Sequence, residues 1–326
     1  MGKACVLAAC VVALGCLPAL AQEAMDLEAA LALFDENGTI QIQYSDDGRA
    51  QLEGMISAFR AALGVTDALD ELEEIDVDAF HVVPEDKDIV NKLSQCYYTL
   101  ADAFLEGVEP DELNTYKKGK HWGLKSLRMN PGFAAIEGDA GSSPKRFIEA
   151  VGQETDIAAL YWGAANWLRE AQFNKLAAVA GQVPDQTEVM SLKCIELDET
   201  YTNYGSYRAL GAFWGGLPRL GILVHYSKNF NKSLGYFCKI VDEPEICAEC
   251  NDCPDFGAFD PVADEYFENR LFFVEFYLME KGGLWEEAKR ILESVLAEPV
   301  GDVYLLYNTI AHEKALAFLA EVEEHL

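Results

Sequence analysis

The stretch Cys194–Pro244 decides the fold class, and it reads CIELDETYTNYGSYRALGAFWGGLPRLGILVHYSKNFNKSLGYFCKIVDEP. It predicts a helix rich in small and aromatic residues at Gly205–Gly215 and an amphipathic helix at Ser227–Val241. The Gly- and Pro-containing break between them predicts a helical hairpin. Because neither helix can bury its apolar stripe alone, the hairpin needs neighbouring helices. Similar units are therefore expected elsewhere in the chain.

The rest of the sequence predicts more helices and no sheet, since no sustained apolar–polar alternation is bounded by turn residues. A helix after a cap at Asp46 or Asp47 is expected to run to Leu63. Gly64–Asp88 and Glu137–Pro144 are interpreted as loops. The other expected helices are Met25–Phe34, Asp88–Gly107, Pro110–Asn130, Thr155–Phe173, Pro184–Leu197, Pro261–Lys281, Leu284–Ala297 and Asp302–Leu326.

The ends of four predicted helices resemble one another. They read SLRMNPGF at Ser126–Phe133, CIELDETY at Cys194–Tyr201, IVDEPE at Ile240–Glu245 and VLAEPVG at Val295–Gly301. Each gives a small or apolar residue, an apolar residue, polar spacers and a stop, which resembles the end of a tetratricopeptide helix. We therefore predict an all-α fold, a tetratricopeptide-like solenoid of helical hairpins with a concave or tubular inner surface.

The first residues predict a secretory signal. Lys3 precedes an apolar run, Ala4–Leu17, and Ala21 ends a small-x-small cleavage site. The run is shorter than the roughly 20 residues that a membrane span needs. We expect a signal peptide at residues 1–21, a periplasmic location and one all-helical domain at residues 22–326. The alternative is lipidation at Cys16.

The composition excludes one class of partner. The sequence has 25 Lys and Arg against 55 Asp and Glu, a formal charge of −30. Nucleic acids and anionic lipid surfaces need clustered basic residues, so neither is expected to bind. The acidity is interpreted as a solvated surface, with a docking face for a basic partner as the alternative. Asp67–Asp78 is the densest acidic run.

An ordered set of phrases resembles a narrower family, the T-components of TRAP transporters (TatT family). The resemblance covers roughly residues 90–326. The phrases are HWGLKSLRMNPGF (His121–Phe133), DIAALYWGAANWLREA (Asp156–Ala171), LDETYTNYGSYRALGAFWGGLP (Leu197–Pro218), SKNFNKSLGYF (Ser227–Phe237) and YLLYNTIAHEKALAFLAEVEEHL (Tyr304–Leu326).

This resemblance implies a periplasmic helical solenoid that binds the substrate-binding P-component during solute uptake. It also implies a hydrophobic or lipid-like ligand in a channel between the helices, and a homo-oligomer, a trimer in this family. Two features depart from the pattern. The family is commonly lipid-anchored, whereas a lipobox is poorly spelled here, and Cys247–Cys253 is an insertion.

Aromatic residues near small ones are the candidate binding residues. Aromatics at helical spacing belong to a core more often than to a ligand site. Together with the resemblance, Trp162, Tyr207 and Trp214 are the leading candidates for an apolar channel or a partner surface. Asn130, before Pro131, is interpreted first as a helix stop. The full candidate set is Trp122, Asn130, Tyr161, Trp162, Trp167, Tyr207, Phe213 and Trp214.

The stretch CAECNDC at Cys247–Cys253 is the most chemically suggestive one. An exported protein enters an oxidising compartment, and six cysteines follow the signal, an even number. We therefore predict disulfides among Cys238, Cys247, Cys250 and Cys253, with the pairing left open. A metal site is the alternative, with Cys238 or His225 as fourth ligand. A reactive thiol is a third interpretation.

The sequence offers no catalytic motif. His312 and Glu313 lack the second histidine of a zinc-protease helix, and no nucleophile elbow, phosphate loop or dinucleotide fingerprint occurs. We predict a non-enzymatic protein without cofactor or metal. Two other classes remain as alternatives: a scaffold for an envelope complex unrelated to transport, and a metal or redox protein centred on the cysteine loop.

Overall fold

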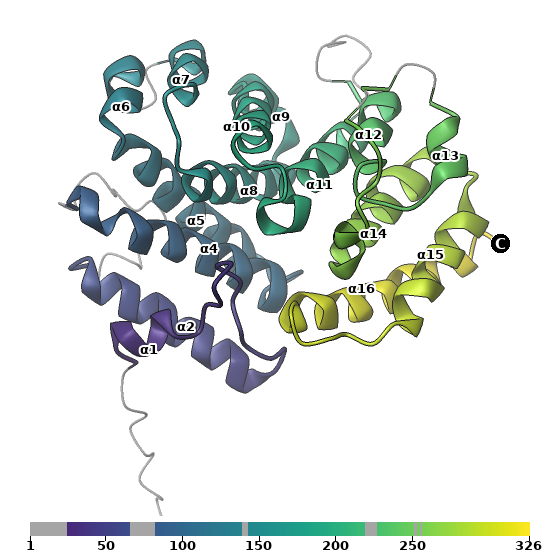
Figure 1. The fold of residues 1–326 in the computed structure, drawn as a ribbon, viewed down its shortest axis with the longest axis horizontal. Coiled ribbons are helices and arrows are strands. Elements are labelled where there is room, and N and C mark those ends of the chain that lie inside the picture. The colour runs from purple at the N-terminus through teal and green to yellow at the C-terminus, as the bar shows by residue number, and fades with distance from the viewer. Residues whose placement is uncertain (1–24, 66–81, 139–142, 219–226, 251–252, 255) are drawn as a thin grey trace, which may run out of the picture.

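A computed structural model describes residues 25–65, 82–138, 143–218, 227–250, 253–254 and 256–326 (Figure 1). The predicted signal peptide, including Cys16 and Ala21, lies outside the described residues. The acidic run Asp67–Asp78 and His225 also lie outside them. No helix in the described ranges is both long and apolar enough to cross a membrane.

The fold is all-α, as predicted. Within the described residues there is no strand, and one isolated bridge joins Phe34 to Ile40. The short helices are the 3-10 segments η2 (Pro84–Asp86) and η4 (Pro261–Glu265) and the π-helix η5 (Val274–Met279). The α-helices are α1 Leu27–Leu31, α2 Asp46–Ala62, α4 Lys87–Phe104, α5 Asp111–Arg128, α6 Pro131–Glu137, α7 Pro144–Val151, α8 Ile157–Phe173, α9 Lys175–Ala180, α10 Val183–Leu197, α11 Tyr201–Gly216, α12 Phe230–Phe237, α13 Pro244–Ala248, α14 Glu268–Phe273, α15 Trp285–Ala297 and α16 Leu305–Glu323.

The long helices pack in the order of the chain. Helix α4 packs on α5, α5 on α8, α8 on α10, α10 on α11, and α11 on α12, and α15 packs on α16 (Figure 1). Short connections join α4 to α5, α10 to α11 and α15 to α16, as in helical hairpins. This order supports the predicted stack of hairpins, while a tetratricopeptide-like superhelical path stays a prediction.

Helices α4, α5 and α8 meet at a joint without space between them, here called the tight joint. A Cβ atom added at Gly123 would lie 2.5 Å from the Cα of Gly163, so two glycines let α5 and α8 touch. Ser94 Oγ donates to Gly119 O at 2.8 Å, and Asn166 Nδ2 donates to Ser94 O at 3.1 Å. Because these polar groups are buried, the hydrogen bonds between the helices fix their register.

Several predicted helix boundaries differ: the helix expected at Pro261–Lys281 is divided into η4, α14 and η5, and the one expected at Ser227–Val241 is the shorter α12. Asn130 ends α5 as predicted and also begins the short helix α6, because its Oδ1 accepts from the backbone N–H of Gly132 at 2.8 Å. The cap of α2 is Ser45, one residue before the predicted pair, and its Oγ accepts from Gly48 N at 3.1 Å. Helices α6, α7, α9 and α13 were not expected from the sequence.

Helix α11 starts with three residues in the left-handed region, here called the left-handed turn. Thr202, Asn203 and Tyr204 have φ values of 50°, 50° and 59°. Regular helix follows, at the predicted start. Such backbone is costly for residues other than glycine and persists only where its surroundings hold it. Arg208 Nη1 donates to Asn203 O at 3.3 Å, and Asn269 Nδ2 donates to Asn203 Oδ1 at 3.0 Å.

The last helix returns to the first long one. The hydroxyl groups of Tyr307 on α16 and Thr99 on α4 lie 3.2 Å apart. Lys314 on α16 pairs with Asp102 of α4 at 3.8 Å and with Glu106 at 3.1 Å. Figure 1 shows α16, in yellow, running back toward α4. The helices from α4 to α16 therefore form a closed circuit around an interior.

Candidate functional site

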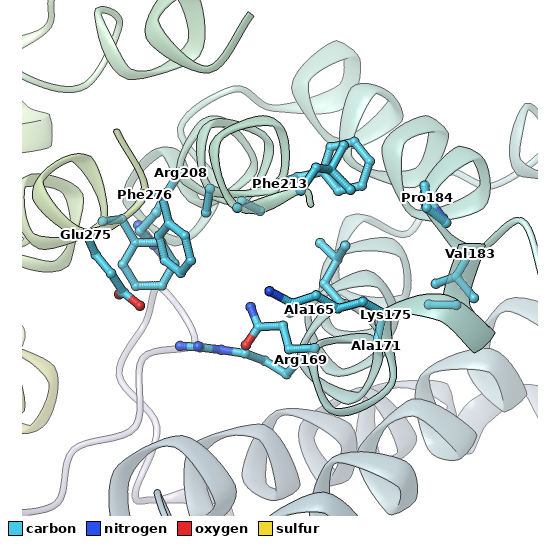
Figure 2. A pocket seen from close by; sticks show the side chains of 18 of the residues that line it. Ala165, Arg169, Ala171, Lys175, Val183, Pro184, Arg208, Phe213, Glu275 and Phe276 are labelled. Atoms are coloured by element: carbon cyan, nitrogen blue, oxygen red, sulfur yellow. The ribbon is translucent and has the colours of Figure 1, made fainter. Parts of the chain in front are cut away.

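A cavity of about 350 Å³ opens between α8, α9, α10, α11 and η5 (Figure 2). This volume lies at the small end of the range of about 300–1,000 Å³ typical of ligand pockets. The lining residues described by the structure are Tyr98, Tyr161, Ala165, Leu168, Arg169, Ala171, Gln172, Lys175, Ala178, Val179, Val183, Pro184, Gly205, Arg208, Ala209, Ala212, Phe213, Gly216, Leu217, Pro218, Phe272, Glu275, Phe276 and Glu280.

Small residues on α8 and α11 create the space. On α11, Ala209, Ala212 and Gly216 recur at helical spacing and face the cavity together with Phe213. On α8, Ala165 occupies the corresponding wall (Figure 2). Short side chains facing each other across two helices would normally allow the helices to close. Here a cavity remains between them, and longer side chains line one end of it.

Those longer side chains are charged or aromatic. Figure 2 shows Arg169, Lys175 and Glu275 pointing into the same space from α8, α9 and η5. The ring of Phe272 lies between two guanidinium groups, with its centroid 5.4 Å from Arg169 Cζ and 5.8 Å from Arg208 Cζ. These contacts are cation–π interactions that place both arginines at the cavity wall.

A cluster of buried and half-buried charged side chains lies at this end of the cavity: Asp102, Arg169, Arg208, Glu268, Glu275 and Lys314. Asp102 Oδ1 accepts from Arg169 Nη2 at 2.5 Å, and Tyr116 Oη donates to the same oxygen at 3.3 Å. Arg208 Nε lies 3.7 Å from Glu268 Oε2. Since buried charges must be paired, this cluster couples α4, α8, α11 and α14.

The carboxyl groups of the cluster have perturbed affinities for protons. Burial opposes ionisation of Asp102, but Lys314 and Arg169 hold its pKa below the usual range. Burial raises the pKa of Glu268, with nearby Asp102 adding to the rise. Burial also raises the pKa of Glu275 to about 7, against the opposing effects of Arg169 and Lys314. Glu275 therefore exchanges its proton near neutral pH.

Arg208 also connects the cavity to the left-handed turn. Its Nη2 donates to Tyr161 Oη at 3.2 Å, and its Nη1 donates to Asn269 Oδ1 at 2.7 Å. Asn269 in turn holds Asn203, as described above. One guanidinium group thus serves as a cavity wall, a partner of Glu268 and a brace for the strained backbone.

The structure places two of the eight predicted binding residues on the cavity wall, Tyr161 and Phe213. The leading three lie elsewhere. Trp162, Tyr207 and Trp214 have exposed fractions of 5%, 2% and 5% and belong to the packed clusters beside the cavity. Tyr207 Oη donates to Glu199, and Trp214 Nε1 donates to Glu188.

The other three predicted residues are structural in their contacts. Trp122 on α5 is completely buried. Trp167 is half-buried, and its ring packs edge-on against Phe147, with the centroids 5.6 Å apart. Asn130 Nδ2 donates to Gln153 O at 2.9 Å while its Oδ1 caps α6, which ties α6 to the end of α7.

The cysteine loop is closed by two disulfides. Cys238 pairs with Cys247, and Cys250 pairs with Cys253. Cys96 and Cys194 are free and buried. Burial raises the pKa of the Cys194 thiol to about 12, so it is not poised for nucleophilic attack. In the described part of the chain, no group of three or more His, Cys, Asp or Glu side chains could hold a metal ion.

Sequence reasoning missed the charged residues of the cavity. A usable signal was present at Arg208, the single charged residue between Gly205 and Gly216. A lone charge in a helix of small and aromatic residues indicates a buried partner or a polar site. Glu275 carried no such signal, because its place in the cavity depends on η5 lying opposite α8.

Residues 77–221 match the family model of the TRAP transporter T-component. The match confirms the resemblance to this family over three of the five sequence phrases, and the two phrases after residue 221 stay predictions. It spans α4 to α11 and so contains the tight joint and most of the cavity wall. The family is a transporter accessory family rather than an enzyme family. None of the curated proteins gave a match to the chain.

Proposed function

We propose that the chain is a non-enzymatic periplasmic accessory, the T-component, of a TRAP-type transporter. It binds the substrate-binding P-component and shelters a hydrophobic ligand in the cavity between α8 and α11. The observation that carries this proposal is the family match over residues 77–221, because those residues include the four α-helices α8, α9, α10 and α11 that line the cavity.

The cavity supports the ligand part of the proposal. Its walls combine small and aromatic side chains with a few convergent polar groups, which is the usual make-up of a small-molecule site. Of the predicted binding residues, Tyr161 and Phe213 are the ones in a position to touch a ligand there. Trp162, Tyr207 and Trp214 support that wall from behind.

An exposed leucine next to the cavity is the natural point at which to test partner binding. Leu176 on α9 is 69% exposed and follows Lys175, which lines the cavity. It is the most exposed of the large apolar side chains in the described residues, so a charge placed there tests whether a partner covers this side of the cavity. Leu316 on α16 is 55% exposed and serves as a matched control because it lies outside the cavity lining.

The test is an affinity pull-down of the tagged mature chain from its own periplasmic extract, with mass spectrometry of the retained proteins. We expect a solute-binding protein to be retained, and Leu176→Glu to weaken its recovery while Leu316→Glu does not. Recovery of envelope assembly proteins alone, or of no protein, contradicts the transport role and favours the scaffold alternative. Size-exclusion chromatography with light scattering on the same sample tests the trimer.

A second measurement addresses the ligand. We expect an organic-solvent extract of the natively purified protein to contain an apolar molecule. Ala165→Leu fills part of the cavity and should lower the yield of that molecule while leaving the far-UV circular dichroism unchanged. An extract that contains no such molecule from the wild type contradicts the sheltering role but leaves the partner role to the pull-down.

A further inference from the structure

The cavity differs in charge from the rest of the chain. Across the sequence, 25 basic residues stand against 55 acidic ones. Among the lining residues that the structure describes, Arg169, Lys175 and Arg208 are cations, and Glu275 and Glu280 are acids. Glu280 already has an ion-pair partner. The described lining thus has three cations against two acids in a chain whose acids outnumber its bases, although Arg169 and Arg208 already pair with Asp102 and Glu268.

Two of the cations, Lys175 and Arg169, can still contact a ligand in the cavity. Lys175 forms no ion pair within the described residues, and its side chain points into the cavity (Figure 2). Arg169 is paired with Asp102, yet its side chain is still 16% exposed at the cavity wall. Arg208, by contrast, is buried and its donors serve Asn269 and Tyr161. An anionic group is therefore expected between Arg169 and Lys175.

The rest of the wall is apolar and suits a hydrocarbon chain. Helix α8 contributes Ala165 to this wall. Helix α11 contributes Ala209, Ala212 and Phe213, and Leu217 follows at its C-terminal end. The volume of about 350 Å³ suits one alkyl chain rather than two. The polar end and the apolar wall together describe an amphiphile.

Glu275 faces the same space as the two cations. In the described part of the chain, no hydrogen bond or ion pair engages its carboxyl group. A ligand anion placed beside an ionised Glu275 would bring two negative charges together, which is unfavourable in a buried site. A protonated Glu275 removes this repulsion and donates a hydrogen bond to the anion.

We propose that the cavity binds a single-chain amphiphile whose anionic head lies between Arg169 and Lys175, and that binding is accompanied by protonation of Glu275. The proton comes from the solvent, and no covalent bond forms or breaks. The inference rests on the sheltering role given under the proposed function. The shared head chemistry is a carboxylate, as in a fatty acid, or a phosphate, as in a single-chain phospholipid.

The charged groups that face Glu275 come from three other elements. Arg169 on α8 and Lys314 on α16 favour its ionised form, whereas Asp102 on α4 and Glu106 after α4 favour the protonated form. Asp102 is itself held by the same Arg169 and Lys314. Arg169 and Lys314 therefore stabilise the ionised form of Glu275 less than they would without Asp102. A ligand anion beside Arg169 would weaken this stabilisation further.

Isothermal titration calorimetry on the delipidated full mature chain tests the head chemistry. The probes are decanoate, decyl phosphate, decanol, decyltrimethylammonium and butyrate, at low ionic strength. We expect the two anions with a ten-carbon chain to bind about tenfold more tightly than decanol and the ammonium compound. Butyrate, which lacks the chain, should bind weakly. A comparison of the affinities for decanoate and decyl phosphate distinguishes a fatty acid from a single-chain phospholipid.

Matched variants locate the head. Lys175→Ala should weaken decanoate binding about five- to tenfold and leave decanol binding unchanged. Because Lys175 is exposed, the variant is expected to fold. Lys145→Ala is the control, since it removes the same charge from an exposed position on α7. Arg169→Lys is the second variant, chosen because it keeps the charge opposite Asp102.

Titrations at pH 8 in buffers with different ionisation enthalpies count the protons. We expect about one proton to be taken up by the wild type with decanoate and none by Glu275→Gln. Equal affinity for the anionic, neutral and cationic ten-carbon probes overturns this inference and leaves the sheltering role intact. Uptake of no proton has the same consequence. Failure of every ten-carbon probe to bind overturns both the inference and the sheltering role, while the pull-down still reports on the partner.

Discussion

The two sides of α8 carry similar small residues, yet one side packs closely against its neighbour and the other borders a cavity. On one side, Gly163 touches Gly123 of α5 and no space remains. On the other, Ala165 faces Ala212 of α11 across the cavity. The difference lies in the surroundings: a hydrogen bond from Asn166 ties α8 to α4 beside the Gly163–Gly123 contact, whereas charged and aromatic side chains line the space between α8 and α11. Small residues therefore permit close packing but do not cause it.

The largest expected effect tests the tight joint. Gly123→Ala places a Cβ atom 2.5 Å from the Cα of Gly163, and backbone cannot move aside cheaply. We expect a loss of about 3 kcal/mol in the free energy of unfolding, measured with urea. Gly216→Ala is the cavity-side counterpart, where the added Cβ meets only the Phe276 ring at 3.2 Å. Its cost should stay below about 1 kcal/mol. Equal losses would remove the contrast between the two sides.

The second prediction concerns the carboxyl group of Glu275, which lines the cavity. Glu275 retains its proton to a pH of about 7 in the folded chain, whereas the ordinary value is 4.5. The folded state thus binds more protons, and this contribution to stability falls as the pH rises from 4.5 through 7. Glu275→Gln removes the fall, so it should stabilise the protein by about 2 kcal/mol at pH 8 and leave it unchanged at pH 4.

Urea unfolding at the two pH values checks this difference. The control is Glu286→Gln, which removes an exposed carboxylate from α15 and should change stability by less than about 0.5 kcal/mol at both. If Glu275→Gln gives the same stability difference at pH 4 and pH 8, folding does not raise the pKa of Glu275, and the prediction is wrong.

The third prediction compares the effect on stability of a larger side chain on the cavity side of α8 with its effect on the packed side. Ala165→Val adds two methyl groups to a wall that faces empty space, whereas Ala164→Val adds them on the adjacent packed position. We expect Ala165→Val to change the unfolding free energy by about 1 kcal/mol or less, and Ala164→Val to cost about 2 kcal/mol. Thermal unfolding of the two variants side by side is sufficient. Reversed values would place the cavity on the wrong side of α8.

The smallest expected effect concerns the left-handed turn that Arg208 braces. Thr202 is β-branched and has φ of 50°, a conformation that glycine adopts freely. Thr202→Gly should stabilise the fold by about 0.5–1 kcal/mol, because relieved strain exceeds the added freedom of the unfolded chain. Thr200→Gly, at φ of −88°, is the control and should not stabilise. Destabilisation of Thr202→Gly would mean that the turn is not strained.

The long helices could be predicted because their apolar spacing and their Pro and Gly stops are local signals. Helix α4 begins at Lys87 and α8 at Ile157, each within two residues of its prediction. Helices α6, α7 and α9 have too few turns for a period to show, and their Pro and Gly neighbours resemble loop signals. Their helical state depends on caps such as Asn130.

The site was harder to predict than the fold. Ala164 and Ala165 are neighbours in the sequence, and one is packed while the other faces a cavity, because the outcome depends on which helix lies opposite. The sequence predicted Trp162 and Trp214 as binding residues, yet these side chains fill the core beside the cavity. The decisive charges came instead from Arg169, Arg208 and Glu275, whose meeting requires three elements distant in sequence.

The contact of α16 with α4 fixes the perimeter of the molecule. A linear stack of hairpins can gain or lose a unit at either end without disturbing the others. Here an added or deleted hairpin would separate Tyr307 from Thr99 and Lys314 from Asp102. The number of helices between α4 and α16 must therefore satisfy a closing condition, much as strand number does in a barrel. A stack of different length would have to change the crossing angles of its helices to keep these contacts.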